Sequence, residues 1–193
     1  MFRPKHLFFS CFLLLLSHLA ITQNNIDLNS LPPVSDITVT MSNPSADTVI
    51  LGLHGGPSDA LYTGDFAYFY NIPTFSVVEV KQYQHYNSSI LNNSAMTLNQ
   101  AIIYNDTTVA MLQKVVKHYN SLGKTVVLIG HSFGAFILCE YVDDYGMSDV
   151  HRVIPMSGRM NMNDTVWQSF KNGYFSDFAS DGVTVNIDNN KSP

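Results

Sequence analysis

Three short runs of apolar residues constrain the fold of this chain more than any other feature. They lie at residues 48–53, 75–80 and 125–130 and read TVILGL, FSVVEV and TVVLIG. Each run is almost continuously apolar, which is typical of interior strands that are covered on both faces. Long connections separate the runs, so we expect the three runs to form neighbouring strands of a parallel sheet.

The segments around these runs alternate between the patterns of strands and helices. Period-two alternation of apolar and hydroxyl residues predicts a strand with one buried face, whereas apolar residues at helical spacing, with a capping residue before them and glycine after them, predict a helix. The sequence has no repeat or linker, so we predict a single α/β domain. In chain order the expected elements are an extended lead-in at 24–36, a strand at 37–43, a helix from Thr97 to Gly123, a helix from Phe133 to Gly146, and a strand at 153–156.

The N-terminus has the layout of a secretory signal peptide. Arg3 and Lys5 precede an apolar run from Leu7 to Leu16, and small or polar residues follow near Ala20. This pattern predicts a signal peptide over residues 1–22, and a mature protein that is secreted or located in the periplasm or extracellular space. The apolar run is shorter than the roughly 20 residues of a spanning helix, so no stable membrane span is expected after cleavage.

Composition and charge exclude several classes of function. The 193 residues are 46% apolar, enough for one domain with a buried core. The formal net charge is -5 and the ten Lys and Arg are scattered, so nucleic acid is not an expected partner. No metal-ligand constellation or phosphate loop is seen, and we expect no metal and no cofactor. Cys11 falls in the signal peptide and Cys139 in an apolar stretch, which predicts a core residue and no internal disulfide.

A serine motif lies directly after the third apolar run. Gly130, Ser132 and Gly134 form a GxSxG pattern that follows a predicted strand and opens a predicted helix. This context is that of a nucleophile elbow, a tight turn that holds a serine hydroxyl exposed above the sheet. The flanking glycines avoid side chains that would collide in so tight a turn. Ser132 is therefore the candidate catalytic nucleophile.

A second glycine motif, HGGP, follows the first apolar run at residues 54–57. Acyl transfer needs two donors directed at the oxyanion, commonly the N–H after the serine and one from a loop after an earlier strand. Phe133 and Gly56 are the candidate donors, with Gly55 as a weaker alternative to Gly56. A glycine turn that only reverses the chain is the structural alternative.

The two motifs and the strand–helix order between them resemble the α/β-hydrolase family, and the HGGP turn is similar to that of proline iminopeptidases. The resemblance implies an α/β-hydrolase-type, mostly parallel sheet with flanking helices. It also implies an acyl-enzyme reaction at an ester or amide bond of a small-molecule or peptide substrate. In this resemblance Ser132 is the nucleophile, His54 shapes the loop, and Gly55, Gly130 and Gly134 shape the turns. The chain departs from iminopeptidases at residues 81–89 and at Phe133, so the substrate is not assigned.

The resemblance also implies a catalytic acid and then a base after Ser132 in chain order. Only His151 follows Ser132, and we expect it at the wrong edge of the sheet. His85 could approach the site from an earlier loop, and Asp164 is the best placed acid, although a helix cap would also explain it.

We therefore expect the acid and base to be missing from this chain. On this interpretation, residues 23–193 are an incomplete α/β-hydrolase domain, truncated after about the sixth strand of the family fold, and 159–193 are the start of a cap region. A non-catalytic hydrolase-fold protein that binds a ligand or partner is the alternative. The oligomeric state stays open.

Overall fold

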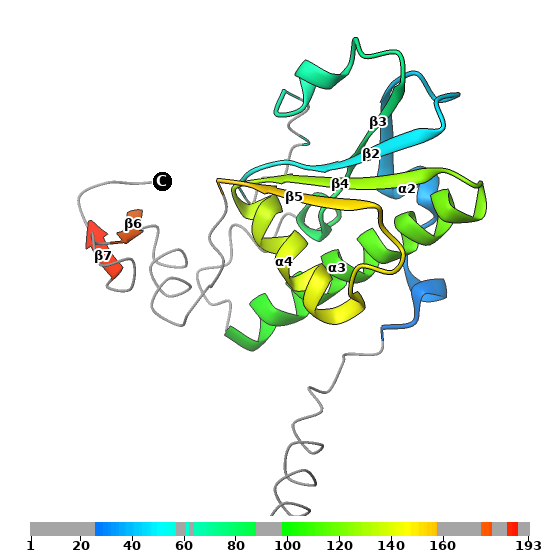
Figure 1. Ribbon diagram of the computed structural model, residues 1–193. Coiled ribbons are helices and arrows are strands. Elements are labelled where there is room, and N and C mark those ends of the chain that lie inside the picture. The colour runs from blue at the N-terminus through cyan, green and yellow to red at the C-terminus, as the bar shows by residue number, and fades with distance from the viewer. Residues whose placement is uncertain are drawn as a thin grey trace, which may run out of the picture.

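A five-stranded sheet forms the centre of the computed structural model (Figure 1), which describes residues 26–56, 61, 64–87, 98–157, 175–178 and 185–188. The strand order is β1-β3-β2-β4-β5. The predicted signal peptide at 1–22, Pro57 and Asp164 lie outside the described residues, as does most of the predicted cap region at 159–193.

Four of the five strands are parallel, as the apolar runs predict. β2, β3, β4 and β5 pair in parallel, and β1 pairs antiparallel with β3 at one edge. In β2 and β3 every residue except the first is buried, because both faces of these strands are covered. A separate antiparallel pair, β6 and β7, stands later in the chain. The strands are β1 Thr38–Ser42, β2 Thr48–Leu53, β3 Phe75–Val80, β4 Thr125–His131, β5 Arg152–Met156, β6 Phe175–Phe178 and β7 Val185–Asp188.

The two predicted helices cover one face of the sheet. Helix α3 (Leu98–Ser121) and helix α4 (Phe133–Tyr145) lie side by side beneath it in Figure 1 and share one core with the strands. Gly123 has φ +73° and Gly146 has φ +69°, the left-handed conformation that ends helices at low cost for glycine. The α/β class and the mostly parallel sheet with flanking helices are thus confirmed.

The opposite face of the sheet is covered near β2 and β3 by the segment around the short 3-10 helix η2 (Ala67–Phe69). Phe66 is fully buried there against Val77 and Ile129. A Cβ atom on Gly52 would lie only 2.6 Å from Cδ2 of Phe66, so the absence of a side chain in β2 makes room for this ring. The contact fixes the segment that carries Asp65, which matters for the site.

The predicted extended lead-in at 24–36 is wrong. The structure has a 3-10 helix η1 (Leu28–Ser30) and a helical turn α2 (Val34–Ile37). Asp27 caps η1 by accepting a hydrogen bond from the N–H of Asn29, and proline is well tolerated just before a helix. Ile37, expected in the strand, is the last residue of α2 and is fully buried. All residues of β1 are half-buried or exposed, because this strand lies at the sheet edge.

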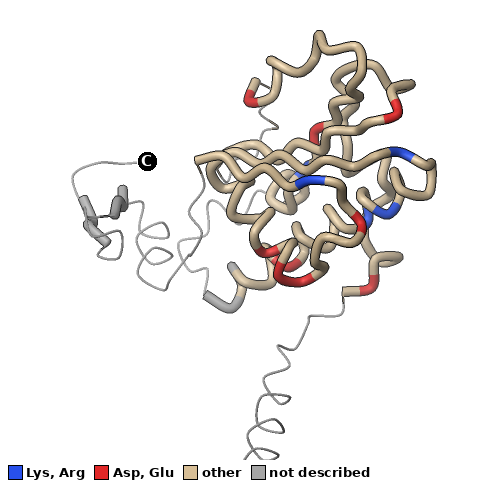
Figure 2. The backbone as a smooth tube through the Cα atoms, viewed as in Figure 1, with Lys and Arg blue, Asp and Glu red and all other residues tan. Residues whose placement is uncertain are grey.

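Charged residues are unevenly placed along the described backbone (Figure 2). Acidic segments gather at α4, where burial and the charges of Asp144, Asp143 and Asp106 raise the pKa of Glu140. Cys139, predicted in the core, is only half-buried, and burial, helped by the charge of Glu140, raises the pKa of its thiol. Among the described residues, no helix combines the length and the apolar character that a membrane span requires.

Candidate active site

Ser132 occupies a strained turn between β4 and α4. Its backbone has φ 51° and ψ −111°, a left-handed conformation that is uncommon for residues other than glycine. The Ser132 N–H donates to the carbonyl of Met156 at 2.8 Å, and the Ser132 carbonyl accepts from the amides of Ala135 and Phe136 at 3.1 and 3.3 Å. Backbone hydrogen bonds on both sides therefore hold the conformation that a nucleophile elbow requires.

The two motif glycines lie where backbones touch. A Cβ atom on Gly130 would lie 2.4 Å from the carbonyl oxygen of Gly134, and a Cβ atom on Gly134 would lie 2.1 Å from that of Leu53. Both distances are far below van der Waals contact, so no other residue fits without movement of the backbone. The first turn of α4 is thereby packed onto the end of β2.

The HGG turn lies at the same edge of the sheet as the serine. It follows β2, whose last residue Leu53 pairs with Gly130 just before the elbow. A Cβ atom on Gly55 would lie 3.1 Å from Cβ of Ser132, so the turn is in direct contact with the elbow. Gly56 has φ +63°, a conformation that favours glycine. The structure thus brings together His54, Gly55, Gly56, Gly130, Ser132, Phe133 and Gly134.

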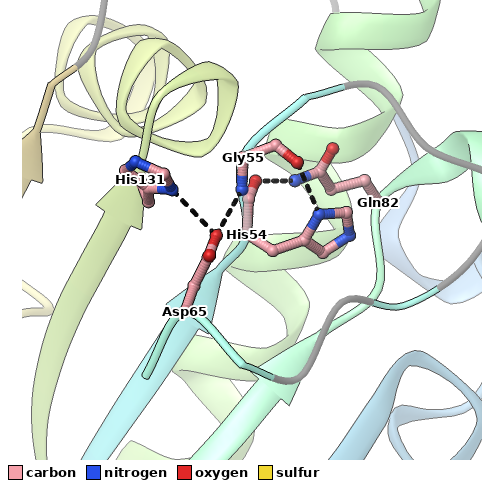
Figure 3. A network of polar contacts seen from close by, with 5 residues as sticks. All are labelled: His54, Gly55, Asp65, Gln82 and His131. Atoms are coloured by element: carbon pink, nitrogen blue, oxygen red, sulfur yellow. Dashed lines mark hydrogen bonds and ion pairs between the residues drawn. The ribbon is translucent and has the colours of Figure 1, made fainter. Parts of the chain in front are cut away.

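Asp65 joins the turn to the elbow (Figure 3). Its Oδ2 accepts a hydrogen bond from the Gly55 N–H at 2.8 Å and lies 2.9 Å from Nδ1 of His131. The Gly55 amide therefore already has an acceptor, whereas no hydrogen bond within the described part of the chain uses the Gly56 amide. This favours Gly56 over Gly55 as the oxyanion donor. Sequence reasoning missed Asp65, and no motif marks it.

His54 is fully buried behind the turn and contacts both sides of it. Its Nδ1 lies 2.8 Å from the carbonyl oxygen of Gly55, and its own carbonyl accepts from Nε2 of Gln82 at 2.8 Å. Its Nε2 lies 3.1 Å from Nε2 of His85. His54 is thus held by specific contacts with the turn and with Gln82, and His85 lies behind it.

No described histidine is hydrogen-bonded to the Ser132 hydroxyl as a base would be, including the adjacent His131, whose Nδ1 contacts Asp65. His151 precedes β5 and donates its N–H to the carbonyl of Val126, near the start of β4, so it lies at the sheet edge opposite Ser132, as predicted. His118 is in the last turn of α3. Within the described part of the chain, no hydrogen bond joins a histidine to the Ser132 hydroxyl.

A buried carboxyl lies at the same end of β3. Glu79 is fully buried, Oε1 accepts from the Tyr70 hydroxyl at 3.1 Å, and Oε2 has no hydrogen-bond partner among the described residues. Burial, helped by the charge of Asp65, raises the pKa of Glu79 to about 7, although the Tyr70 hydrogen bond lowers it in part. A Cβ atom on Gly52 would lie 3.2 Å from Oε2. No sequence pattern marks this carboxyl beyond its place in a strand.

The described residues contain no group of three or more His, Cys, Asp or Glu side chains that could hold a metal ion.

No family model and no curated protein matches the sequence.

Three solved structures are similar to this chain. MenH from S. aureus is 16% identical with a TM-score of 0.46, and the match covers 66% of this chain and 44% of that one. A phospholipase/carboxylesterase from Dyadobacter fermentans is 15% identical with a TM-score of 0.49 over 68% and 65% of the two chains. A proline iminopeptidase from Mycobacterium smegmatis is 16% identical with a TM-score of 0.47 over 65% and 42%. The chain therefore spans less than two thirds of the length of each of these proteins.

Proposed function

We propose that this chain belongs to a secreted serine hydrolase of the α/β-hydrolase type that cleaves an ester or amide bond through an acyl-enzyme. The observation that carries the proposal is the strained Ser132 at a strand–helix junction, in direct contact with the HGG turn. A Cβ atom on Gly55 would lie 3.1 Å from Cβ of Ser132. Secretion rests on the signal peptide pattern at residues 1–22.

In the proposed reaction the Ser132 hydroxyl oxygen attacks the substrate carbonyl carbon, and the carbonyl oxygen becomes an oxyanion. The amides of Gly56 and Phe133 donate to that oxyanion. Phe133 is the first residue of α4, and the first amides of a helix have no partner within it and favour negative charge. Collapse of the intermediate breaks the bond to the alcohol or amine, which leaves with the proton that the Ser132 hydroxyl lost. Water then hydrolyses the acyl-serine ester, which releases the carboxylic acid and restores the Ser132 hydroxyl.

The base of this reaction is not assigned to a described histidine. The expected chain order places the acid and the base after Ser132, and the one described histidine there, His151, is at the opposite sheet edge. His85 is directed at His54 rather than at Ser132. A non-catalytic hydrolase-fold binding protein is the second candidate, because no described histidine is hydrogen-bonded to the Ser132 hydroxyl.

Fluorophosphonate labelling tests the proposal. We would label this chain and a version extended through the downstream reading frame, with Ser132→Ala as the test variant and the exposed Ser121→Ala as the matched control. Labelling that is lost only in Ser132→Ala supports the serine mechanism. Labelling that persists in Ser132→Ala places the nucleophile elsewhere, and absence of labelling in both versions favours the binding protein.

A further inference from the structure

We propose that His85 sets the tautomer of His54 and thereby fixes the direction of the peptide between Gly55 and Gly56. That peptide carries the Gly56 N–H, so the role of His85 as a positioning residue for the oxyanion hole rests on the proposed function. The orientation of the peptide itself follows from hydrogen bonds among the buried His54 and Gln82 and the half-buried His85, and is independent of catalysis.

The first step is the hydrogen bond between Gln82 and His85. The Gln82 N–H donates to Nδ1 of His85 at 2.9 Å. A ring nitrogen that accepts a hydrogen bond carries no hydrogen, so a neutral His85 holds its hydrogen on Nε2. The Gln82 carbonyl oxygen is equally near to Nδ1, but it already accepts from the His85 backbone N–H at 3.0 Å, whereas the Gln82 N–H can only donate. The short 3-10 helix η3 (Tyr83–His85) and its capping residue Gln82 therefore favour one tautomer of His85.

The tautomer of His85 in turn determines the tautomer of His54. The two Nε2 atoms lie 3.1 Å apart and the rings meet edge to face, with an interplanar angle of 77°. One hydrogen can occupy the space between these nitrogens, and it belongs to His85. Nε2 of His54 is therefore an acceptor, and its Nδ1 carries the hydrogen that is donated to the carbonyl oxygen of Gly55 at 2.8 Å.

The third step fixes the oxyanion donor. In a trans peptide the C=O and the following N–H point in opposite directions, and no cis peptide occurs among the described residues. Because the Gly55 carbonyl is directed at the buried ring of His54, the Gly56 N–H points away from that ring. It is therefore directed out of the buried network, as an oxyanion donor must be.

The opposite tautomer has a defined consequence. Nδ1 of His85 also lies 2.9 Å from the carbonyl oxygen of Gln82, to which it would donate if it carried the hydrogen. Nε2 of His54 would then donate to His85, leaving two acceptors, Nδ1 of His54 and the Gly55 carbonyl, facing each other. Rotation of the Gly55–Gly56 peptide would relieve this repulsion and turn the Gly56 N–H inward. Glycine on both sides of this peptide permits the backbone angles that the rotation requires.

Other hydrogen bonds restrict this rotation to the peptide between Gly55 and Gly56. Asp65 holds the Gly55 N–H, and Gln82, itself hydrogen-bonded to Gln84, holds the His54 carbonyl. His54 and Gln82 are fully buried and Gln84 is 6% exposed, so water does not compete for these partners. The two tautomers of the histidine pair thus correspond to a formed and an unformed oxyanion hole.

Imidazole ¹⁵N NMR on the full chain tests the relay. We expect the hydrogen of His54 on Nδ1 and that of His85 on Nε2. In His85→Gln the side-chain amide can still donate to Nε2 of His54, so the His54 tautomer is retained, whereas in His85→Leu it changes or averages. A His54 hydrogen on Nε2 in the unmodified chain overturns the proposal, and so does an unchanged His54 tautomer in His85→Leu.

The link to catalysis is measured by the rate of fluorophosphonate labelling at Ser132, in whichever version of the protein labels. We expect a loss of about a hundredfold in His85→Leu, the typical effect of removing one oxyanion donor, and recovery of most of that loss in His85→Gln. The remote His151→Gln is the matched control. An unchanged rate in His85→Leu refutes the positioning role.

The outcomes separate this inference from the proposed function. If Ser132 labels in no version, the hydrolase proposal fails, and the NMR tautomers still decide the relay. If His85→Leu does not fold, as circular dichroism would show, the tautomers of the unmodified chain and of His85→Gln decide it.

Discussion

Replacement of Glu79 by glutamine should stabilise the protein at alkaline pH. The Glu79 carboxyl is fully buried, and its pKa is raised from 4.5 to about 7. Burial is the main cause, the charge of Asp65 adds to it, and the hydrogen bond from Tyr70 opposes it in part. The folded state therefore favours the protonated carboxyl more than the unfolded state does.

The sign and size of the effect follow from proton linkage. A carboxyl with a raised pKa contributes most stability below its unfolded value of 4.5, and this contribution is lost as the pH rises through about 7. At about 1.4 kcal/mol per pKa unit, the interval corresponds to roughly 3 kcal/mol of unfolding free energy. The amide side chain of Glu79→Gln would remain neutral at every pH and could still accept from Tyr70, so the variant escapes this loss.

Urea denaturation followed by circular dichroism at pH 4.5, 7 and 8.5 would measure the difference. We expect Glu79→Gln and the unmodified protein to agree within about 1 kcal/mol at the lowest pH and to diverge by roughly 3 kcal/mol at the highest. Asp47→Asn, at an exposed carboxylate, is the matched control. Equal unfolding free energies at pH 8.5 would refute the reasoning, because they would mean that ionised Glu79 is not destabilising.

Four further predictions concern the elbow, a helix end, export and activity. Gly134→Ala should lower the unfolding free energy by about 3 kcal/mol or more, measured by urea denaturation, because its Cβ would lie 2.1 Å from the carbonyl oxygen of Leu53. Gly123→Ala, at φ +73° in open space, should cost only about 1 kcal/mol in the same assay. Terminal sequencing of secreted protein should find a mature N-terminus between about residues 21 and 24, and a start at Met1 would contradict the signal peptide. The chain should hydrolyse p-nitrophenyl acetate no more than roughly a thousandfold faster than water does, because no described histidine is placed as a base at Ser132 and the oxyanion donors would act alone. Hydrolysis at the rate of a working hydrolase would contradict this.

The five strands of the sheet and the helices α3 and α4 could be predicted because their signals are local, whereas β6 and β7 lie where the sequence predicted no strand. The run TVILGL coincides with β2, and the capping and glycine signals lie within three residues of the ends of α3 and α4. The elbow and the HGG turn are also local, because each is a short motif at the end of an apolar run. The lead-in failed for the opposite reason, since a proline pair is compatible both with extended chain and with the start of the helical turn α2.

The contacts around the turn could not be predicted, because they join residues far apart in the chain. Asp65 contacts a backbone amide and a histidine on two different elements, and Gln82 reaches the carbonyl of His54 from the end of another strand. No residue type or spacing distinguishes Asp65 from other loop carboxylates. The sequence placed His85 near the site, but only the geometry shows that it is directed at His54.

Two energetically unfavourable features near Ser132 favour a functional site over a glycine turn that only reverses the chain. Ser132 holds a left-handed backbone that costs about 1–3 kcal/mol, and Glu79 buries a carboxyl oxygen with no partner among the described residues. A reversing turn requires neither of these, nor a buried histidine, His54, that contacts a second histidine behind it. Both unfavourable features lie at the carboxyl edge of the parallel strands, where ligands bind in open α/β sheets. Local rules are commonly broken at functional sites, so this concentration supports Ser132 and the HGG turn as one site.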